Sequence, residues 1–161
     1  MIHLIVGNTG SGKTTYAHIL KEKSASIIFS IDQWNKTLFL PDKKPTDGLD
    51  WFLERIERSE TMIMDLIHQL EKAGTDSILD LGLSKFEHRE KFRRFSKENG
   101  YQLTTHFLDI PKDIRYQRVL KRNNEKGDTF QFEVSQADFD FMETWFEKTT
   151  ETELKNSIII N

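Results

Sequence analysis

The chain has 161 residues, no cysteine and a formal net charge of -3. This length predicts a single domain, residues 1–161, and the lack of cysteine excludes disulfides, thiolate metal sites and a cysteine nucleophile. No apolar run approaches the ~18 residues of a membrane span and none follows a basic leader, so we expect a soluble, cytoplasmic protein. The near-neutral charge argues against a large nucleic-acid footprint but leaves a local groove open.

The first predicted element is a strand over residues 2–6, which leads into a glycine-rich segment. Residues 7–14 satisfy the P-loop pattern G-x-x-x-x-G-K-S/T, and a helix-compatible stretch follows them. In this pattern backbone N–H groups cradle phosphates, Lys13 reaches the β- and γ-phosphate oxygens, and the Thr14 hydroxyl binds Mg²⁺. We therefore predict that the chain binds ATP and Mg²⁺. The predicted nucleotide-binding residues are Gly7, Asn8, Thr9, Gly10, Ser11, Gly12, Lys13, Thr14 and Thr15.

The second strand is predicted over residues 26–30 and leads to Asp32, the candidate catalytic base. A carboxylate within hydrogen-bond reach of an acceptor hydroxyl can take its proton, which is worth about 10²- to 10⁴-fold in rate. The alternative is that Asp32 caps the following turn. Trp34 is a candidate for stacking on a flat acceptor, with core packing as the alternative, and residues 36–48 are placed to shape an acceptor pocket.

A long amphipathic helix is predicted over residues 49–73, because apolar residues recur there at steps of three and four. The third strand, residues 77–81, delivers Asp80 near its carboxyl end, where ligands of open α/β sheets collect. Asp80 is therefore predicted to hold Mg²⁺ together with Thr14, directly or through water. The alternative is an aspartate that only serves the turn before Gly82.

The next helix is predicted to open with a capping-box sequence at residues 84–87 and to end at Asn99. Arg89 lies on this helix. It is a candidate for contact with the acceptor or with a phosphate.

A helix predicted from Pro111 to about Arg122 carries arginines that share one face, namely Arg115, Arg118 and Arg122. Guanidinium groups stabilise the charge that builds on a transferring phosphoryl group. Arg118 and Arg122 are therefore predicted to be catalytic residues of a lid over the phosphates. The alternative is a solvated charged face.

The remaining elements complete an alternating pattern. A strand is predicted over residues 103–108, a mobile polar loop over 123–128, a helix over 136–147 and a buried strand over 157–160, and the lid is placed at 115–134. Strands that alternate with helices are typical of an α/β domain with a mainly parallel sheet between two layers of helices. We expect five strands.

These motifs resemble the small P-loop kinases of the zeta-toxin and polynucleotide-kinase-like group, whose members are often labelled AAA-family ATPases or predicted kinases. The resemblance covers nearly the whole chain and rests on residues 7–15, 30–34, 79–82, 118–123 and 139–147. It implies a three-layer P-loop NTPase domain with a five-stranded parallel sheet in the order 2-3-1-4-5, a catalytic Asp32, and lid arginines at Arg118 and Arg122.

One departure from the family pattern concerns the acceptor. Members that act on nucleic acid ends or nucleotide sugars often have Asp-Asp-x-Arg, whereas this chain has Asp32-Gln33-Trp34-Asn35 and so lacks the arginine that would hold an acceptor phosphate. The leading interpretation is an ATP- and Mg²⁺-dependent kinase that phosphorylates a hydroxyl of a small molecule. A polynucleotide 5′-hydroxyl kinase and an ATP-hydrolysing switch without a phosphoryl acceptor are the alternatives.

Overall fold

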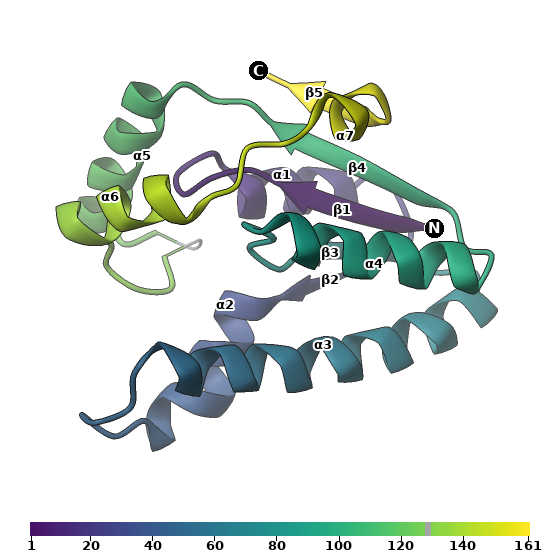
Figure 1. Cartoon of the computed structure of the whole chain (residues 1–161), viewed down its shortest axis with the longest axis horizontal. Coiled ribbons are helices and arrows are strands. Elements are labelled where there is room, and N and C mark those ends of the chain that lie inside the picture. Colours follow the sequence, from purple (N-terminus) through teal and green to yellow (C-terminus); the bar gives the residue numbers. More distant parts are fainter. Residues whose placement is uncertain (128–129) are drawn as a thin grey trace.

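The computed structural model of the chain describes residues 1–127 and 130–161. A five-stranded sheet in the order β2-β3-β1-β4-β5 forms its centre, and every pair of neighbouring strands is parallel. The predicted strand order and α/β class are therefore confirmed (Figure 1). The strands are β1 (Ile2–Val6), β2 (Ser26–Ser30), β3 (Asp76–Asp80), β4 (Leu103–Leu108) and β5 (Ser157–Ile160).

Helices cover both faces of this sheet (Figure 1). The α-helices are α1 (Lys13–Lys21), α2 (Ile31–Trp34), α3 (Leu49–Lys72), α4 (Phe86–Glu98), α5 (Lys112–Glu125), α6 (Gln136–Trp145) and α7 (Glu151–Lys155). A short π-helix, Asn35–Phe39, and a 3-10 turn, Leu40–Asp42, lead from α2 toward α3. No helix in the described ranges is long and apolar enough to span a membrane.

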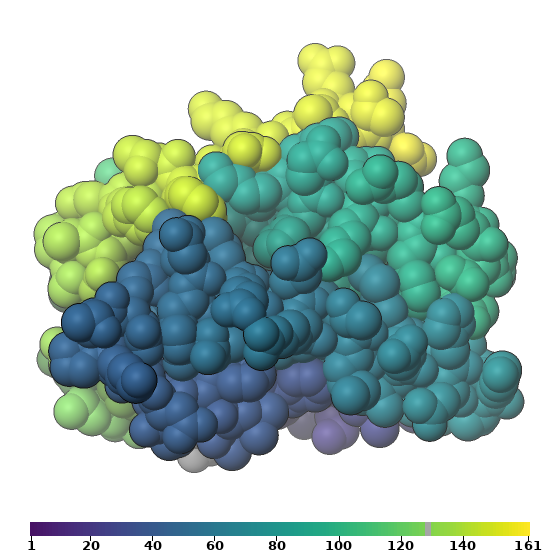
Figure 2. Space-filling model, turned by 60° about the horizontal axis from the view of Figure 1, so that its bottom comes forward, coloured from purple at the N-terminus to yellow at the C-terminus, as the bar shows by residue number. Residues whose placement is uncertain are grey.

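The alternation of side chains along β1 divides the core between the two faces. Leu4 belongs to a cluster with Ile63 of α3 and Phe92 of α4, whereas Ile5 packs with Ala17 of α1 on the other face. All of these side chains are fully buried. Because the central strands are buried on both sides, they appear in the sequence as continuous apolar runs. In a space-filling view, α3 and the turns before it form one broad outer surface (Figure 2).

The last strand differs from its prediction. β5 lies at the edge of the sheet and pairs with β4, and 51% of Ile158 and 49% of Ile159 are exposed. An apolar run alone does not distinguish a central strand from an edge strand, so the prediction of a buried strand is wrong at these positions.

The start of α4 also differs from its prediction. The Ser84 hydroxyl donates to the Gly82 carbonyl instead of capping the helix, which begins at Phe86. The cap comes from a distant residue, because the Glu147 carboxylate accepts a 2.7 Å hydrogen bond from the Phe86 N–H. The predicted capping box at residues 84–87 is therefore wrong.

The first residues of the segment predicted as a mobile polar loop are helical. α5 continues to Glu125, and the Asn123 side chain both donates to and accepts from the backbone of Val134, at 2.8 and 3.2 Å. These bonds join α5 to the segment before α6. Asp128, the end of the predicted loop, lies outside the described residues.

Candidate active site

The P-loop connects β1 to α1 and opens a helix N-terminus toward a cavity. Gly10 and Gly12 have φ values of 79° and 93°, which favour glycine, and a Cβ on Gly10 would lie 2.5 Å from the Arg115 carbonyl oxygen. The loop therefore needs glycine for both its conformation and its close approach to α5. The first N–H groups of α1 have no partner within the helix, so this end of α1 suits an anion.

Lys13 folds back over this loop. Its ammonium group donates to the carbonyl oxygens of Gly7 and Asn8, at 2.9 and 3.3 Å. Burial lowers the pKa of Lys13, although the nearby carboxylates of Asp80 and Asp32 act in the opposite direction. A phosphate in the loop would offer this buried charge stronger partners than two carbonyl groups do.

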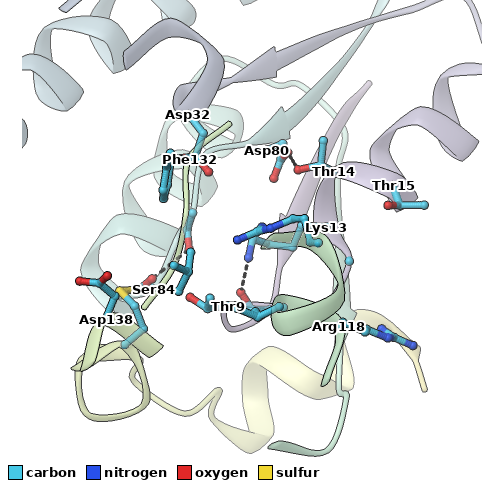
Figure 3. Close-up of a pocket in the computed structure, with 18 of the residues that line it drawn as sticks. Thr9, Lys13, Thr14, Thr15, Asp32, Asp80, Ser84, Arg118, Phe132 and Asp138 are labelled. Carbon is cyan, nitrogen blue, oxygen red and sulfur yellow. Dashed lines mark hydrogen bonds between the residues drawn. The ribbon is translucent and has the colours of Figure 1, made fainter. Parts of the chain in front are cut away.

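Asp80, at the end of β3, lies beside Thr14 at the start of α1. The Thr14 hydroxyl donates a 2.7 Å hydrogen bond to the Asp80 carboxylate (Figure 3). A hydroxyl and a carboxylate at this distance are oxygen ligands of the kind that Mg²⁺ uses next to phosphates. No cluster of three or more His, Cys, Asp or Glu side chains suited to a metal occurs in the described part of the chain, so such an ion would also need phosphate or water ligands.

Asp32 follows β2 and faces the same cavity as Asp80. Ser30, not Asp32, is the N-cap of α2, because its hydroxyl accepts from the Gln33 N–H at 3.4 Å. The Asp32 carboxylate is open to the cavity, and its partial removal from solvent raises its pKa; the Asp80 charge adds to this, and Lys13 and Arg122 oppose it. The Asp32 side chain is thus not the cap of the turn after β2, which was the alternative to a role in the site.

A cavity of about 710 Å³ brings these groups together (Figure 3). Its walls come from the P-loop, from the residues after β2 and β3, and from α5 and α6. The carboxyl ends of parallel strands lie along the same side of the sheet. Residues that are distant in the sequence but follow different strands therefore meet there. The predicted site residues in its lining are Gly7, Thr9, Gly10, Gly12, Lys13, Thr14, Thr15, Asp32, Asp80, Arg118 and Arg122.

The three arginines of α5 have different environments. Arg118 and Arg122 line the cavity, and Arg118 donates to the Ser11 carbonyl at 3.1 Å. Burial lowers the pKa of Arg122 while Asp32 raises it, and the buried Arg122 Nε has no hydrogen-bond partner among the described residues. Arg115 is buried with 6% exposure and lies outside the cavity lining. The shared helix face therefore brings two of the three arginines to the site.

Arg115 instead links the P-loop to α6. Its guanidinium donates to the Thr9 carbonyl at 3.1 Å and to both oxygens of Glu143, at 2.6 and 3.0 Å. Glu143 also accepts from the Asn8 side chain at 2.6 Å. Asn8, predicted to bind nucleotide, therefore uses its side chain to hold α6 against the loop. Glu143 was not predicted, because a single glutamate on an amphipathic helix gives no sequence signal for this contact.

The structure contradicts the prediction that Arg89 contacts an acceptor or a phosphate. Arg89 is fully buried, and its Nε donates to Glu153 at 2.6 Å. Burial alone would raise the pKa of Glu153, but hydrogen bonds from Arg89, the Thr150 N–H and Arg93 lower it to about 2. Arg89 therefore joins α4 to α7 and is not available to a ligand.

Trp34 and the segment after it also lie outside the cavity lining. The Trp34 ring packs edge-on against Phe29, with centroids 6.1 Å apart. It joins the core cluster between the sheet and helices α3 and α4. This is the packing alternative that the sequence left open. The predicted acceptor wall at residues 36–48 contributes nothing to the described lining.

The wall comes instead from residues that the sequence did not single out as functional. Residues from the segment before α6 and from α6 itself fill this role, namely Phe132, Glu133, Val134, Asp138, Phe141 and Met142. Met142 lies on the predicted helix over residues 136–147, and its side chain lines the cavity. A helix that offers one apolar face to the core and another to a ligand looks the same in sequence as a helix with one broad apolar face.

Comparison with known proteins gives a family and a fold. The AAA_33 family, described as an AAA domain, matches residues 2–149. A UPF0200 protein of Saccharolobus islandicus is 29% identical over 122 residues, which are 74% of this chain and 63% of that protein. The chain thus matches less than two thirds of the length of this relative.

Two solved structures share the fold at low identity. Kti12 of Chaetomium thermophilum in complex with ADP-AlF3 has a TM-score of 0.68 and 11% identity over 99% of this chain and 88% of that one. A gluconokinase from Sinorhizobium meliloti has a TM-score of 0.62 and 12% identity over 98% of this chain and 80% of that one. These likenesses confirm a P-loop NTPase-like fold.

Proposed function

We propose that this chain, which belongs to the AAA_33 family of AAA domains and has the fold of small P-loop kinases, moves the γ-phosphate of ATP to a hydroxyl of a small molecule. The observation that carries the proposal is the position of Asp32. Its carboxylate faces the P-loop across the cavity, is not used as a helix cap, and has a raised pKa. A group of this kind suits proton abstraction.

An unpartnered polar atom at the site fits a bound triphosphate. Arg122 lines the cavity, and its buried Nε has no hydrogen-bond partner in the described residues. Buried polar groups are rarely left unsatisfied, and phosphate oxygens would supply partners at this place. Mg²⁺, held by Thr14 and Asp80, would neutralise charge on the phosphate oxygens.

In the proposed reaction Asp32 accepts the proton of the acceptor hydroxyl as its oxygen forms a bond to the γ-phosphorus. The bond from that phosphorus to the bridging oxygen breaks, and ADP leaves with the electron pair. Lys13 moves from the carbonyl groups of Gly7 and Asn8 to the β- and γ-phosphate oxygens. Arg118 and Arg122 close over the triphosphate, and Arg122, whose charge acts on Asp32, stabilises the equatorial oxygens.

We also propose that the described parts of residues 115–134 cover the phosphates. Arg115 holds the first turn of α5 to the P-loop, whereas the last turn carries Arg122 over the cavity. A non-hydrolysable ATP analogue with Mg²⁺ should slow hydrogen exchange at residues 118–127 and 130–134. Equal exchange with and without the analogue would contradict this role.

The decisive experiment measures transfer of a radiolabelled γ-phosphate. Purified protein with ATP and Mg²⁺ is tested against hydroxyl metabolites, nucleosides, antibiotics and 5′-hydroxyl oligonucleotides. A kinase labels one class of acceptor and loses this activity in Asp32→Asn. Release of inorganic phosphate with no labelled product from any class would identify an ATP-hydrolysing switch instead.

A further inference from the structure

The phosphates of a bound nucleotide lie in a fixed order along the P-loop. This order distinguishes the nucleoside end of the cavity from the acceptor end. The loop N–H groups hold the α- and β-phosphates, and Lys13 and Thr14 serve the γ-phosphate side. Figure 3 shows Thr15 and Arg118 at one side of Lys13, and Asp32 and Phe132 at the other. The nucleoside therefore belongs to the Thr15 side. The Asp32 and Phe132 side, called here the acceptor end, remains for the phosphoryl acceptor.

The acceptor end has an apolar wall. Phe132 lies at this end, and Phe141 and Met142 line the same cavity from α6, whose Asp138 also lies on the Asp32 side of Lys13 in Figure 3. The exposed fraction is 45% for Phe132 and 50% for Phe141. Large aromatic side chains left open in a cavity indicate a surface that a ligand covers. Phe141 and Met142 follow Asp138 by three and four positions, so all three lie on one face of α6.

This wall is held in place from outside the cavity. The Asn123 side chain fixes the backbone of Val134, two residues after Phe132, and Glu143 ties α6 to Arg115 and Asn8. The wall is thus formed before any ligand arrives, which lowers the entropy cost of binding.

The charges at the acceptor end are negative. Besides Asp32, Glu133 and Asp138 line this region, and neither makes an ion pair among the described residues. Hydrogen bonds from the Ser135 hydroxyl and N–H lower the pKa of Asp138, so it stays ionised at neutral pH. Glu133 is exposed to solvent.

No cation in the described lining is left over for an acceptor phosphate. The basic side chains there are Lys13, Arg118 and Arg122, which the triphosphate requires. Arg89, the other candidate, is buried against Glu153. An acceptor that carried a phosphate would meet carboxylates and aromatic rings without a counter-charge, which is unfavourable.

From this we infer, resting on the proposed function, that the acceptor is an amine-bearing alcohol with an apolar or aromatic body, and not a phosphorylated compound such as a nucleotide or a polynucleotide end. The apolar body lies against Phe132, Phe141 and Met142. The ammonium group lies near Glu133 and Asp138, and the hydroxyl reaches Asp32.

The test separates recognition from transfer. Aromatic amino alcohols such as phenylalaninol are each paired with the neutral N-acetyl form, and a 5′-hydroxyl oligonucleotide represents phosphorylated acceptors. Binding of each compound to the protein with ADP and Mg²⁺ is measured by NMR titration, and transfer of labelled phosphate is measured separately. We expect the amines to bind about fivefold more tightly than their N-acetyl forms, as for a partly exposed ion pair.

Charge reversal provides the matched variants. Glu133→Lys should weaken binding of the amines about tenfold and leave the N-acetyl forms and ADP within about twofold. Glu98→Lys, the same charge change at an exposed position at the far end of α4, should change none of them. Phe132→Ala should weaken both members of each pair, because it removes apolar contact and no charge.

Two outcomes would overturn the inference. One is equal or tighter binding of the N-acetyl forms or the oligonucleotide to the wild-type protein, and the other is equal binding by Glu133→Lys and Glu98→Lys. Failure of the proposed function looks different. In that case the amines bind with the expected preference, but no compound is labelled while inorganic phosphate is released.

Discussion

The Thr14 hydroxyl donates a 2.7 Å hydrogen bond to the Asp80 carboxylate, which joins the first turn of α1 to the end of β3. In a complex with nucleotide, Mg²⁺ would replace this direct bond, since both oxygens are ligands that it accepts. Thr14 and Asp80 are therefore both placed to hold the ion, and we expect the two residues to act together.

Asp80→Asn should raise the Mg²⁺ concentration needed for tight ATP binding by about 10- to 100-fold, because a carboxylate ligand or its water contact is lost. ATP affinity measured across a Mg²⁺ titration checks this. Asp65→Asn, an exposed position on α3, serves as the control for the change of charge. Identical Mg²⁺ dependence in the two variants would remove Asp80 from the metal site.

Lys13→Ala should abolish nucleotide binding and turnover while the protein stays folded. The ammonium group is buried against carbonyl oxygens and its pKa is lowered, so it costs free energy in the absence of phosphate. The thermal midpoint of the ligand-free variant should therefore equal or exceed that of the wild type, and ATP should no longer raise it. A folded variant that still gains stability from ATP would contradict the P-loop assignment.

The sequence predicts the parts of the site that local pattern controls. The P-loop spacing and the aspartates at the ends of β2 and β3 follow from motifs and from apolar runs, the strand order follows from the family resemblance, and parallel strands bring their carboxyl ends together. Asp32 and Asp80 therefore reach one cavity as expected. These features need no knowledge of how distant helices pack.

The roles of Arg89 and Arg115 depend on such packing and could not be predicted. Their partners, Glu153 and Glu143, lie 64 and 28 residues farther along the chain. A stripe of arginines is the same in sequence whether its members face a ligand or a buried carboxylate. The acceptor wall was missed for the same reason, because the orientation of α6 depends on its contact with the P-loop.

Glu143→Ala tests that contact. It removes the carboxylate that accepts from the buried Arg115 guanidinium and from the Asn8 side-chain amide, which should lower the free energy of unfolding by about 1–3 kcal/mol. Because the same residues support the loop, ATP affinity should also fall. Urea unfolding and ATP titration measure the two effects, and Asp140→Ala, at an exposed position of the same helix, is the control. Reduced stability with unchanged ATP affinity would limit Glu143 to a structural role.

A pair of histidines predicts acid sensitivity of the fold. His3 Nδ1 lies 3.0 Å from His106 Nε2, and the other His106 nitrogen is 2.9 Å from the Tyr16 hydroxyl. Burial lowers the pKa of His106 from 6.5 to about 4, with a further contribution from His3. Burial lowers the pKa of His3 as well, against the opposing effect of Asp76.

A histidine with a lowered pKa binds its proton more readily in the unfolded chain. The free energy of unfolding therefore has its full value above pH 6.5. It falls as the pH falls from 6.5 toward 4, with a slope of at most about 1.4 kcal/mol per pH unit for His106. Urea unfolding at pH 7.5 and 5.5 should show this loss, and His106→Gln should reduce it. His18→Gln, at an exposed position, should not. Glu153 affects stability only at lower pH, because its ordinary pKa is 4.5.

Asp32 separates a kinase from a switch. If its carboxylate takes the proton of the acceptor, Asp32→Asn keeps the shape of the side chain and removes the base. Phosphoryl transfer should then fall by about 10²- to 10⁴-fold, while ATP affinity stays within a few fold. Gln33→Ala, the exposed neighbour, is the control, since the Gln33 contact to Ser30 uses only its backbone N–H.

A switch predicts a different pattern for the same variant. There a carboxylate near the γ-phosphate would serve Mg²⁺ or the attacking water, so its loss would weaken ATP binding or slow hydrolysis with no dependence on an acceptor. ATP affinity and acceptor-stimulated turnover, measured on one preparation of Asp32→Asn, therefore distinguish the two. Unchanged transfer at saturating acceptor would refute the role of Asp32 as a base. It would mean that the reaction does not need a carboxylate at this position, despite its raised pKa in the wild-type protein.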